Sequence, residues 1–251
     1  METIIPGNKE KGVVLSFDVE SWSNLCGGKY DLSANPEDEY GHFLPRLLDV
    51  LDSYNVKAQF FICGKVVELY PFLFRSLVQK GHGLGGHGYE HEVMPNLRIS
   101  EQMTVVNRVK KTMKQVLGIS PISWRCPGLA ANLGTYVALR NHGFRISSNA
   151  IRIDKPFSVK GIADIPLAEK MDGDFLGFYL PITSSGIQIW ADYMKKEFDR
   201  ISKGILVLGM HTWVQRKYDP RLEAIRSFLT YVEPFMGEVW MGRLDDLQWK
   251  V

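Results

Sequence analysis

The chain has 251 residues, of which 45% are hydrophobic and 23% are charged. This balance is typical of a globular enzyme and excludes a largely disordered chain. The formal net charge is only +2 and no run of five basic residues occurs, so the composition gives no reason to expect a nucleic-acid partner. We expect a single domain over residues 1–251, because α/β barrels of about 250 residues are common.

The three cysteines, at positions 26, 63 and 126, form no Cys-x-x-Cys pair and are odd in number. This usage argues against a disulfide framework. The first residues lack the apolar core of a secretion signal, and no stretch approaches the roughly 18 apolar residues of a membrane span. From these features we expect a cytoplasmic protein with no transmembrane segment, whose oligomeric state the sequence leaves open.

Strand-like and helix-like patterns alternate along the first half of the chain. The predicted elements are a buried strand at 12–17, a polar loop at 21–36, a helix at 39–54, a strand at 56–62, helices at 71–81 and 100–118, and a short strand at 122–125. Ser100 is the predicted N-cap of its helix. A loop as long as the one at 21–36 is usually functional or mobile.

The second half repeats this alternation less regularly. Its predicted elements are a helix at 132–141, strands at 144–147 and 161–166, a helix that ends before Gly204, a strand at 205–211 and a last helix that begins at Asp219. Residues 170–186 match no pattern. Repeated strand–helix units predict a parallel sheet, either a barrel or a doubly wound sheet. In both folds the C-terminal ends of the strands share one edge, so side chains placed there converge.

Six polar residues whose side chains can bind a metal ion or take part in catalysis lie at or near the ends of these segments. They are Asp18, Glu20, His87, His91, Arg125 and His211. Two histidines four residues apart on a helical turn can bind one metal ion, and a nearby carboxylate completes an open three-ligand site. The alternative is a coincidental histidine pair and two solvated acids. Glycines on both sides of His87 and the apolar run before Asp18 favour a site.

Two other kinds of site are formally available. Gly81, Gly83 and Gly86 match the spacing of a dinucleotide fingerprint, but a helix precedes them where a strand is required, which disfavours nicotinamide binding. Two histidines and a carboxylate are also the ligands of iron oxygenases. Such an oxygenase would be expected on an all-β scaffold, which the alternating helices do not support.

Four motifs follow one another along the chain. They are F-D-V-E at 17–20, G-H-G-L-G-G-H-G-Y-E-H at 81–91, W-R-C-P-G at 124–128 and L-G-M-H-T-W at 208–213. Together they resemble the ordered motifs of the polysaccharide deacetylase (NodB-homology, carbohydrate esterase 4-like) family. The resemblance implies a distorted (β/α) barrel, usually with seven strands, and metal-dependent removal of an N- or O-acyl group from a sugar. Related members hydrolyse other amides, including cyclic ureides.

The resemblance also implies a metal site. Glu20, His87 and His91 would bind a divalent ion, with Zn²⁺ expected first and Fe²⁺, Co²⁺ or Mn²⁺ as alternatives. In many members of the family the second acid directly follows the first, whereas Val19 stands at that position here. The ligand role therefore shifts to Glu20.

The remaining motif residues would carry out or support proton transfer. The resemblance makes Asp18 the general base, with Arg125 holding it ionised, and His211 the general acid. A backbone N–H after Arg125 would share the oxyanion charge. The family also has an acid that tunes this histidine, for which Asp164 in I-A-D-I-P is the candidate. The plain alternatives are a structural salt bridge for Arg125 and a buried core histidine for His211.

The expected substrate is an N-acetylated amino sugar in a nucleotide-linked or lipid-linked precursor. A small cyclic amide is the enzymatic alternative, and a non-catalytic sugar-binding relative is the alternative from another class. Four aromatic side chains beside the motifs could stack on sugar rings or belong to the core, namely Trp22, Tyr89, Trp124 and Trp213.

Overall fold

The computed structural model describes residues 2–21, 38–151, 155–177 and 184–250. The polar loop predicted at 21–36 lies outside these ranges except for its first residue. None of the helices within them combines the length and the apolar character needed to cross a bilayer.

Nine strands form one curled sheet. They are β2 Lys11–Val19, β3 Gln59–Ile62, β4 Gly83–Gly86, β5 Ser123–Trp124, β6 Ile146–Ser147, β7 Phe157–Val159, β8 Ile162–Asp164, β9 Gly204–His211 and β10 Val239–Met241. Seven of them follow the order β9-β2-β3-β4-β5-β6-β8, and all neighbours in this series are parallel. β10 lies parallel to the first residues of β2, and β7 pairs antiparallel with β8. The predicted seven-stranded parallel arrangement is confirmed.

The barrel is closed irregularly by the chain that follows β8. The N–H of Ala168 donates to the carbonyl oxygen of Val207 in β9 (2.8 Å), and the N–H of Asp172 donates to that of Gly209 (3.4 Å). Gly209 permits this approach, because a Cβ atom there would lie only 2.6 Å from Cδ2 of Leu167. The result is a distorted barrel in which Asp172 reaches the C-terminal end of β9.

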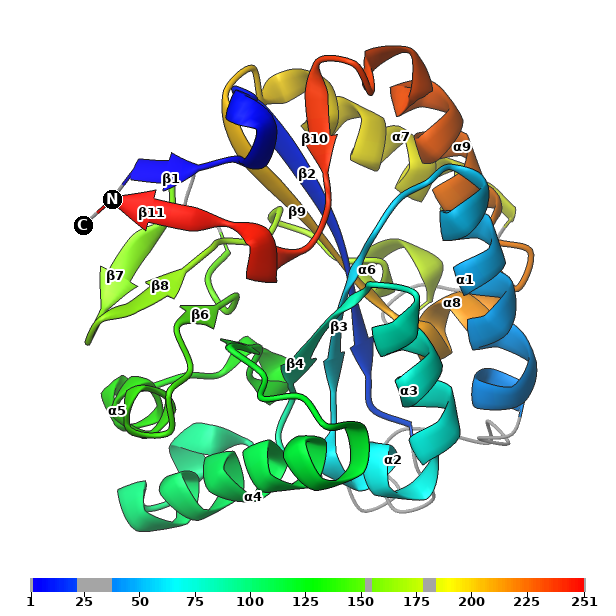
Figure 1. Ribbon diagram of the computed structural model, residues 1–251. Coiled ribbons are helices and arrows are strands. Elements are labelled where there is room, and N and C mark those ends of the chain that lie inside the picture. The colour runs from blue at the N-terminus through cyan, green and yellow to red at the C-terminus, as the bar shows by residue number, and fades with distance from the viewer. Residues whose placement is uncertain (1, 22–37, 152–154, 178–183, 251) are drawn as a thin grey trace.

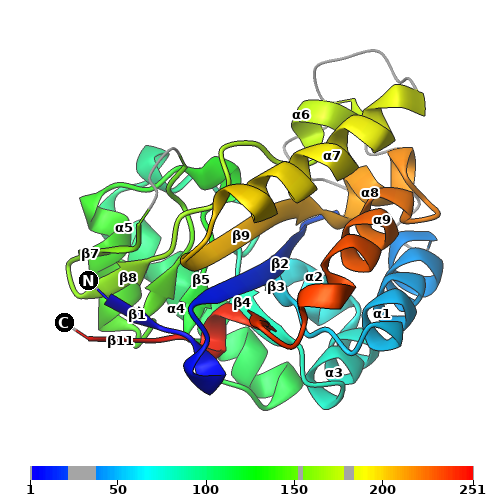
Figure 2. The same ribbon diagram turned by 90° about the horizontal axis from the view of Figure 1, so that it is seen from above.

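Helices cover the outer side of the sheet (Figure 1 and Figure 2). They are α1 Leu44–Ser53, α2 Gly64–Leu69, α3 Pro71–Gln79, α4 Ile99–Leu117, α5 Leu133–Asn141, α6 Gly173–Leu176, α7 Ser184–Arg200, α8 Thr212–Tyr218 and α9 Glu223–Val232. A π-helical turn, Asp38–Phe43, leads into α1, and 3-10 turns lie at Pro6–Asn8, Met94–Asn96, Pro127–Leu129, Glu233–Phe235 and Leu244–Asp246. Two further strands, β1 Glu2–Ile4 and β11 Gln248–Lys250, pair antiparallel and bring the two chain ends together (Figure 1).

The side chains of β2 alternate between two apolar regions. Its odd-numbered residues from Val13 to Val19 belong to the large core shared with the helices, whereas Val14 belongs to a smaller cluster inside the barrel. Because side chains alternate along a strand, Ser16 and Asp18 share the inner face with Val14. Polar side chains therefore replace apolar ones on the inner face as β2 approaches the C-terminal edge of the barrel.

Local predictions differ from the structure at several points, and no element is predicted at α2, α8, β7 or β10. No strand is predicted at β4, because its glycines leave almost no side-chain pattern from which a strand can be recognised. α4 begins one residue before Ser100, so this serine is not its N-cap. α9 begins later than predicted, although the carboxylate of Asp219 accepts the first two N–H groups of the helix at 2.8 and 2.9 Å. The other predicted helices and strands are present with shifted ends.

Candidate active site

The C-terminal ends of four strands bring the predicted polar residues to one edge of the barrel. In the parallel register of β2 and β9, Asp18 lies beside His211. Glu20 follows two residues after Asp18, so it extends from the same face of the chain. His87 and Arg125 directly follow β4 and β5. Residues far apart in the sequence thus share one site.

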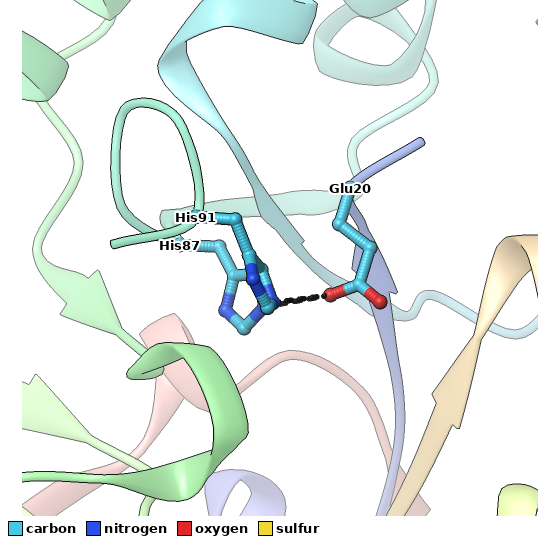
Figure 3. Close-up of side chains that lie close together, drawn as sticks. All are labelled: Glu20, His87 and His91. Atoms are coloured by element: carbon cyan, nitrogen blue, oxygen red, sulfur yellow. Dashed lines mark hydrogen bonds and ion pairs between the residues drawn. The ribbon is translucent and has the colours of Figure 1, made fainter. Parts of the chain in front are cut away.

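Glu20, His87 and His91 form a compact cluster with the donor atoms of a metal site (Figure 3). Nε2 of His87 and Nε2 of His91 each lie 3.0 Å from Oε2 of Glu20. One ligand atom from each residue lies within 4.8 Å of the other two. Two imidazoles and one carboxylate are the protein ligands of an open, catalytic type of zinc site.

The two histidines come from a tight loop, and the helical turn expected from their spacing is wrong. His91 has a left-handed backbone φ of 63°, and Gly88 has a φ of 71°. A Cβ atom on Gly88 would lie 2.8 Å from Oε2 of Glu92. That oxygen accepts two backbone N–H groups of the loop, at 2.8 and 3.1 Å. Left-handed residues and a carboxylate cap therefore turn both rings toward Glu20.

The hydrogen bonding of His87 supports a cation in this cluster. Nδ1 of His87 lies 2.9 Å from the carbonyl oxygen of Arg125. Because a carbonyl only accepts, Nδ1 carries the hydrogen, and a neutral ring presents its Nε2 lone pair to Glu20. A lone pair and a carboxylate oxygen 3.0 Å apart repel each other unless the ring is protonated or a cation lies between them. The donor set thus fits a divalent ion.

Glu20 is held ionised and oriented by its neighbours. Burial opposes its ionisation, but His91 and His87 hold the pKa of the carboxyl well below its usual range. Burial also opposes protonation of His91, yet the charge of Glu20 raises the pKa of this ring above its ordinary value. The other oxygen of Glu20 accepts a hydrogen bond from Nε1 of Trp213 at 2.8 Å, which fixes the plane of the carboxylate.

Asp18 and Arg125 form a buried ion pair beside the cluster. Nη1 of Arg125 donates to Oδ1 of Asp18 at 2.9 Å, and the side chains are 0% and 4% exposed. Nη2 of Arg125 donates to Oγ of Ser16 (2.9 Å) and to Oγ of Ser148 (3.2 Å). Its Nε donates to the carbonyl oxygen of Ser148 (3.1 Å). The guanidinium also lies over the ring of Phe61, 4.4 Å from its centroid. The predicted pairing of Arg125 with Asp18 is present.

His211 is paired with a carboxylate that sequence reasoning missed. Nδ1 of His211 lies 2.8 Å from Oδ1 of Asp172, whose Oδ2 accepts the backbone N–H of His211 at 2.8 Å. Nε2 of Gln215 also donates to this carboxylate, at 2.9 Å. Burial disfavours the charged imidazole, but Asp172 outweighs it and, with Glu20 and Asp18, raises the pKa of His211 to about 10.

The prediction that Asp164 tunes His211 is wrong. Asp164 ends β8 and accepts hydrogen bonds from Tyr136, Ser147 and the residues after it. The carboxylate on Nδ1 of His211 is Asp172, which lies in the stretch 170–186 that matches no sequence pattern. Asp172 reaches the histidine only because the chain after β8 runs along β9, and no local periodicity encodes that path.

The aromatic residues beside the motifs belong to the interior. Tyr89, Trp124 and Trp213 are all buried, so sugar stacking by their faces is not supported, and Trp213 instead donates to Glu20. Trp22 lies outside the described residues. Cys126 is fully buried, and burial raises the pKa of its thiol to about 12.

Comparison with known protein families identifies a match. The family model of the polysaccharide deacetylases matches residues 7–147, more than half of the chain. Among curated proteins, the peptidoglycan deacetylase of Helicobacter pylori is 26% identical over 159 residues, which cover 61% of this chain and 54% of that protein. The peptidoglycan-N-acetylglucosamine deacetylase of Bacillus cereus is 29% identical over 85 residues, 34% of this chain and 31% of that protein. The chain thus matches about a third to a half of the length of these relatives.

Solved structures share the fold over nearly the whole chain. The Puue allantoinase superposes with a TM-score of 0.78 at 17% identity, covering 96% of this chain and 90% of that one. A family 4 carbohydrate esterase from Streptomyces lividans superposes with a TM-score of 0.61 at 17% identity and covers 93% of each chain. At this identity the likeness establishes the distorted barrel.

Proposed function

Since the chain belongs to the polysaccharide deacetylase family, we propose that it is a metal-dependent hydrolase that removes an N-acyl group, above all acetyl, from an amino sugar or a sugar-containing precursor. The observation that carries this proposal is the convergence of a base and an acid beside the metal cluster. Oδ2 of Asp18 lies 4.0 Å from Nε2 of His211. An acyl group bound beside this pair would meet the base and the acid that amide hydrolysis requires.

Glu20, His87 and His91 are the proposed metal ligands, and Zn²⁺ is the proposed ion. Nitrogen ligands with one carboxylate suit zinc, while Fe²⁺, Co²⁺ and Mn²⁺ accept the same donors. A divalent ion held there polarises an acyl carbonyl and lowers the pKa of water. The hydrogen bond from Trp213 keeps the Glu20 carboxylate in position for this purpose.

Asp18 is the proposed general base. Its Oδ1 is occupied by Arg125, whose permanent charge favours the carboxylate form. Its Oδ2 is the oxygen that lies near Nε2 of His211, the proposed acid. In this position Asp18 can take a proton from the attacking water.

His211 is the proposed general acid. With a pKa raised to about 10, the ring is protonated at neutral pH. Asp172 holds its Nδ1, which leaves the Nε2–H as the proton for the departing amine. The loop after Arg125 supplies a further donor. The N–H of Cys126 is already donated to Oδ1 of Asn149 (2.7 Å) and Pro127 has none, so the N–H of Gly128 is the first one that can stabilise an oxyanion.

A small cyclic amide is the second candidate substrate. The superposition with the Puue allantoinase supports it, because that enzyme shares the fold over 96% of this chain. The same base and acid would then open a ring without releasing acetate. A non-catalytic sugar-binding protein is disfavoured, since such a protein gains nothing from one buried and one partly buried ion pair whose desolvation costs free energy.

Metal analysis combined with product assays tests the proposal. We expect about one equivalent of metal per chain and acetate release from at least one N-acetylated sugar, lost with chelator and restored by Zn²⁺. The substrate panel should contain free, nucleotide-linked and oligomeric N-acetylated sugars together with cyclic ureides. Ring opening without acetate release would favour the second candidate. Bound metal without turnover of any member of the panel would refute both.

A further inference from the structure

Asp164 is a fully buried carboxylate with only neutral hydrogen-bond donors around it among the described residues. The donors are Tyr136 Oη (2.8 Å), Ser147 Oγ (2.6 Å), the N–H and Nδ2 of Asn149 (3.2 and 3.4 Å) and the N–H of Ala150 (3.2 Å). Most of them belong to the segment 147–150, which follows β6. A buried carboxylate is costly unless such bonds satisfy it, so its presence calls for a function.

The segment 147–150 in turn holds Arg125. The carbonyl oxygen and Oγ of Ser148 accept two hydrogen bonds from the guanidinium, at 3.1 and 3.2 Å. Asn149 bridges the two parts of the network, since its Nδ2 donates to Asp164 while its Oδ1 accepts the N–H of Cys126. Asp164 therefore accepts hydrogen bonds from segment 147–150. The same segment accepts hydrogen bonds from the side chain of Arg125 and from the backbone next to it.

Because Arg125 is held by segment 147–150, it also fixes the position of the Asp18 carboxylate. Its guanidinium is a planar fork, so the bonds to Ser148 on one side determine where Nη1 lies on the other. Nη1 donates to Oδ1 of Asp18 at 2.9 Å, and both side chains are buried. A shift of segment 147–150 would rotate the fork and move the Asp18 carboxylate.

We propose that Asp164 is a positioning residue, which holds segment 147–150 and thereby the Arg125 fork in the orientation that places Asp18 for proton abstraction. The catalytic consequence rests on the proposed function, whereas the effect on Arg125 does not. An asparagine at position 164 would replace one acceptor oxygen by an NH₂ group that faces the donors of the segment. Asp164→Asn should therefore loosen segment 147–150 without touching the metal ligands.

Hydrogen exchange of the Arg125 side chain tests the positioning without any substrate. The Nε–H of Arg125 is buried and donates to Ser148, so it should exchange slowly with solvent in the wild-type protein. In Asp164→Asn we expect exchange at least about 10-fold faster, read by side-chain NMR. The Nε–H of Arg243, which donates to Asp246 at 2.9 Å, is the internal control. Unchanged exchange at Arg125 in folded Asp164→Asn would overturn the proposal.

A double-mutant comparison tests the route from Asp164 to catalysis. We expect Asp164→Asn to lower kcat about 10- to 100-fold with metal content unchanged, because small displacements of catalytic groups have effects of this size. In an Arg125→Lys background, which cannot keep the fork contacts, the same change should cost less than about 3-fold. Equal losses in both backgrounds would show that Asp164 acts independently of Arg125.

Two further variants complete the design. Asp52→Asn, at an exposed ion pair with Lys57 and Lys80, is the matched control and should leave kcat and Arg125 exchange unchanged. If Asp164→Asn does not fold, Asn149→Ala removes the bridge and one donor to the carboxylate but keeps Asp164 itself, and should give the same two results. A wild-type protein without turnover refutes the proposed function, and the exchange measurement still decides the positioning.

Discussion

The metal-binding half of the site and its acid–base half hold charge in different ways. In the metal-binding half, made of Glu20, His87 and His91, the ligand atoms lie close together, and among the described residues no lysine or arginine pairs with Glu20. In the acid–base half each charged group has an opposite partner, namely Arg125 for Asp18 and Asp172 for His211. The first half therefore suits an ion from outside, as proposed above, whereas the second is balanced within the chain.

This difference predicts that the two halves can be disabled separately. Loss of the ion should leave the ion pairs of the acid–base half in place, because they share no ligand atom with the cluster. Loss of the base should leave metal content intact, because none of the metal ligands bonds to Asp18. Each of the following experiments tests one side of this separation.

The largest effect is expected for Asp18→Asn. Without a base the rate should fall by about 10²- to 10⁴-fold, while metal content measured by elemental analysis stays near that of the wild type. His87→Ala should lose both. Asn keeps an acceptor for Arg125 but leaves its charge unpaired, so stability should fall, and rates must be compared below the unfolding temperature of the variant. Metal loss in Asp18→Asn would show that the two halves are coupled.

The next effect concerns the pH dependence of the acid. Asp172 is the main group that raises the pKa of His211 to about 10, against the effect of burial. A general acid must be protonated to act, so with His211 in the proposed role the rate should decline as pH rises through its pKa. Asp172→Asn should lower that pKa, so the decline of kcat at high pH should begin at a pH at least about one unit lower. Asp174→Asn changes an exposed neighbour and is the control. A basic limb that does not move would exclude His211 as the acid.

The contrast between the halves also explains what the sequence could predict. Glu20, His87 and His91 are found from short motifs, because the two histidines stand four residues apart in one glycine-rich motif and Glu20 follows a recognisable strand. The barrel is likewise predicted from local patterns, since apolar runs such as 12–17 and 205–211 alternate with helical periodicity. β4 is not predicted, because its glycines give no side-chain pattern. The position of His87 nevertheless depends on β4, which directly precedes it.

The partners of the acid–base half depend on contacts between distant segments. Asp172 meets His211 because the chain after β8 hydrogen bonds to β9, and no sequence period reports that irregular path. Asp164 lies in the strand predicted at 161–166, whereas Asp172 lies in the stretch 170–186 that matches no sequence pattern. The structure gives Asp164 other partners, the donors of segment 147–150. Residue type and local pattern locate the ends of strands, but they do not determine which carboxylate faces which ring.

A smaller effect is expected from Trp213→Phe in the metal-binding half. Nε1 of Trp213 orients Glu20 through one hydrogen bond at 2.8 Å. Its removal should weaken metal affinity by about 10-fold, measured by competition with a chelator. Trp190→Phe is the matched control, because the indole nitrogen of Trp190 is buried and has no hydrogen-bond partner among the described residues. Equal affinity in the two variants would mean that Trp213 contributes packing alone.

The smallest effect concerns Glu39, a buried acid next to the acid–base half. Unlike Asp18 and His211, it has a neutral hydrogen-bond partner. Glu39 accepts a hydrogen bond from the neutral hydroxyl of Thr212, and burial raises its pKa to about 7. Because the folded state favours the protonated form, stability should fall as pH rises from about 4.5 through about 7 and then level off. Glu39→Gln cannot ionise, so it should match the wild type at pH 4.5 and exceed it at pH 8 by on the order of 2 kcal/mol. Urea unfolding at both pH values measures this difference, with the exposed Glu238→Gln as control. A stability difference that is the same at both pH values would mean that Glu39 is already balanced, as the other charges of this half are.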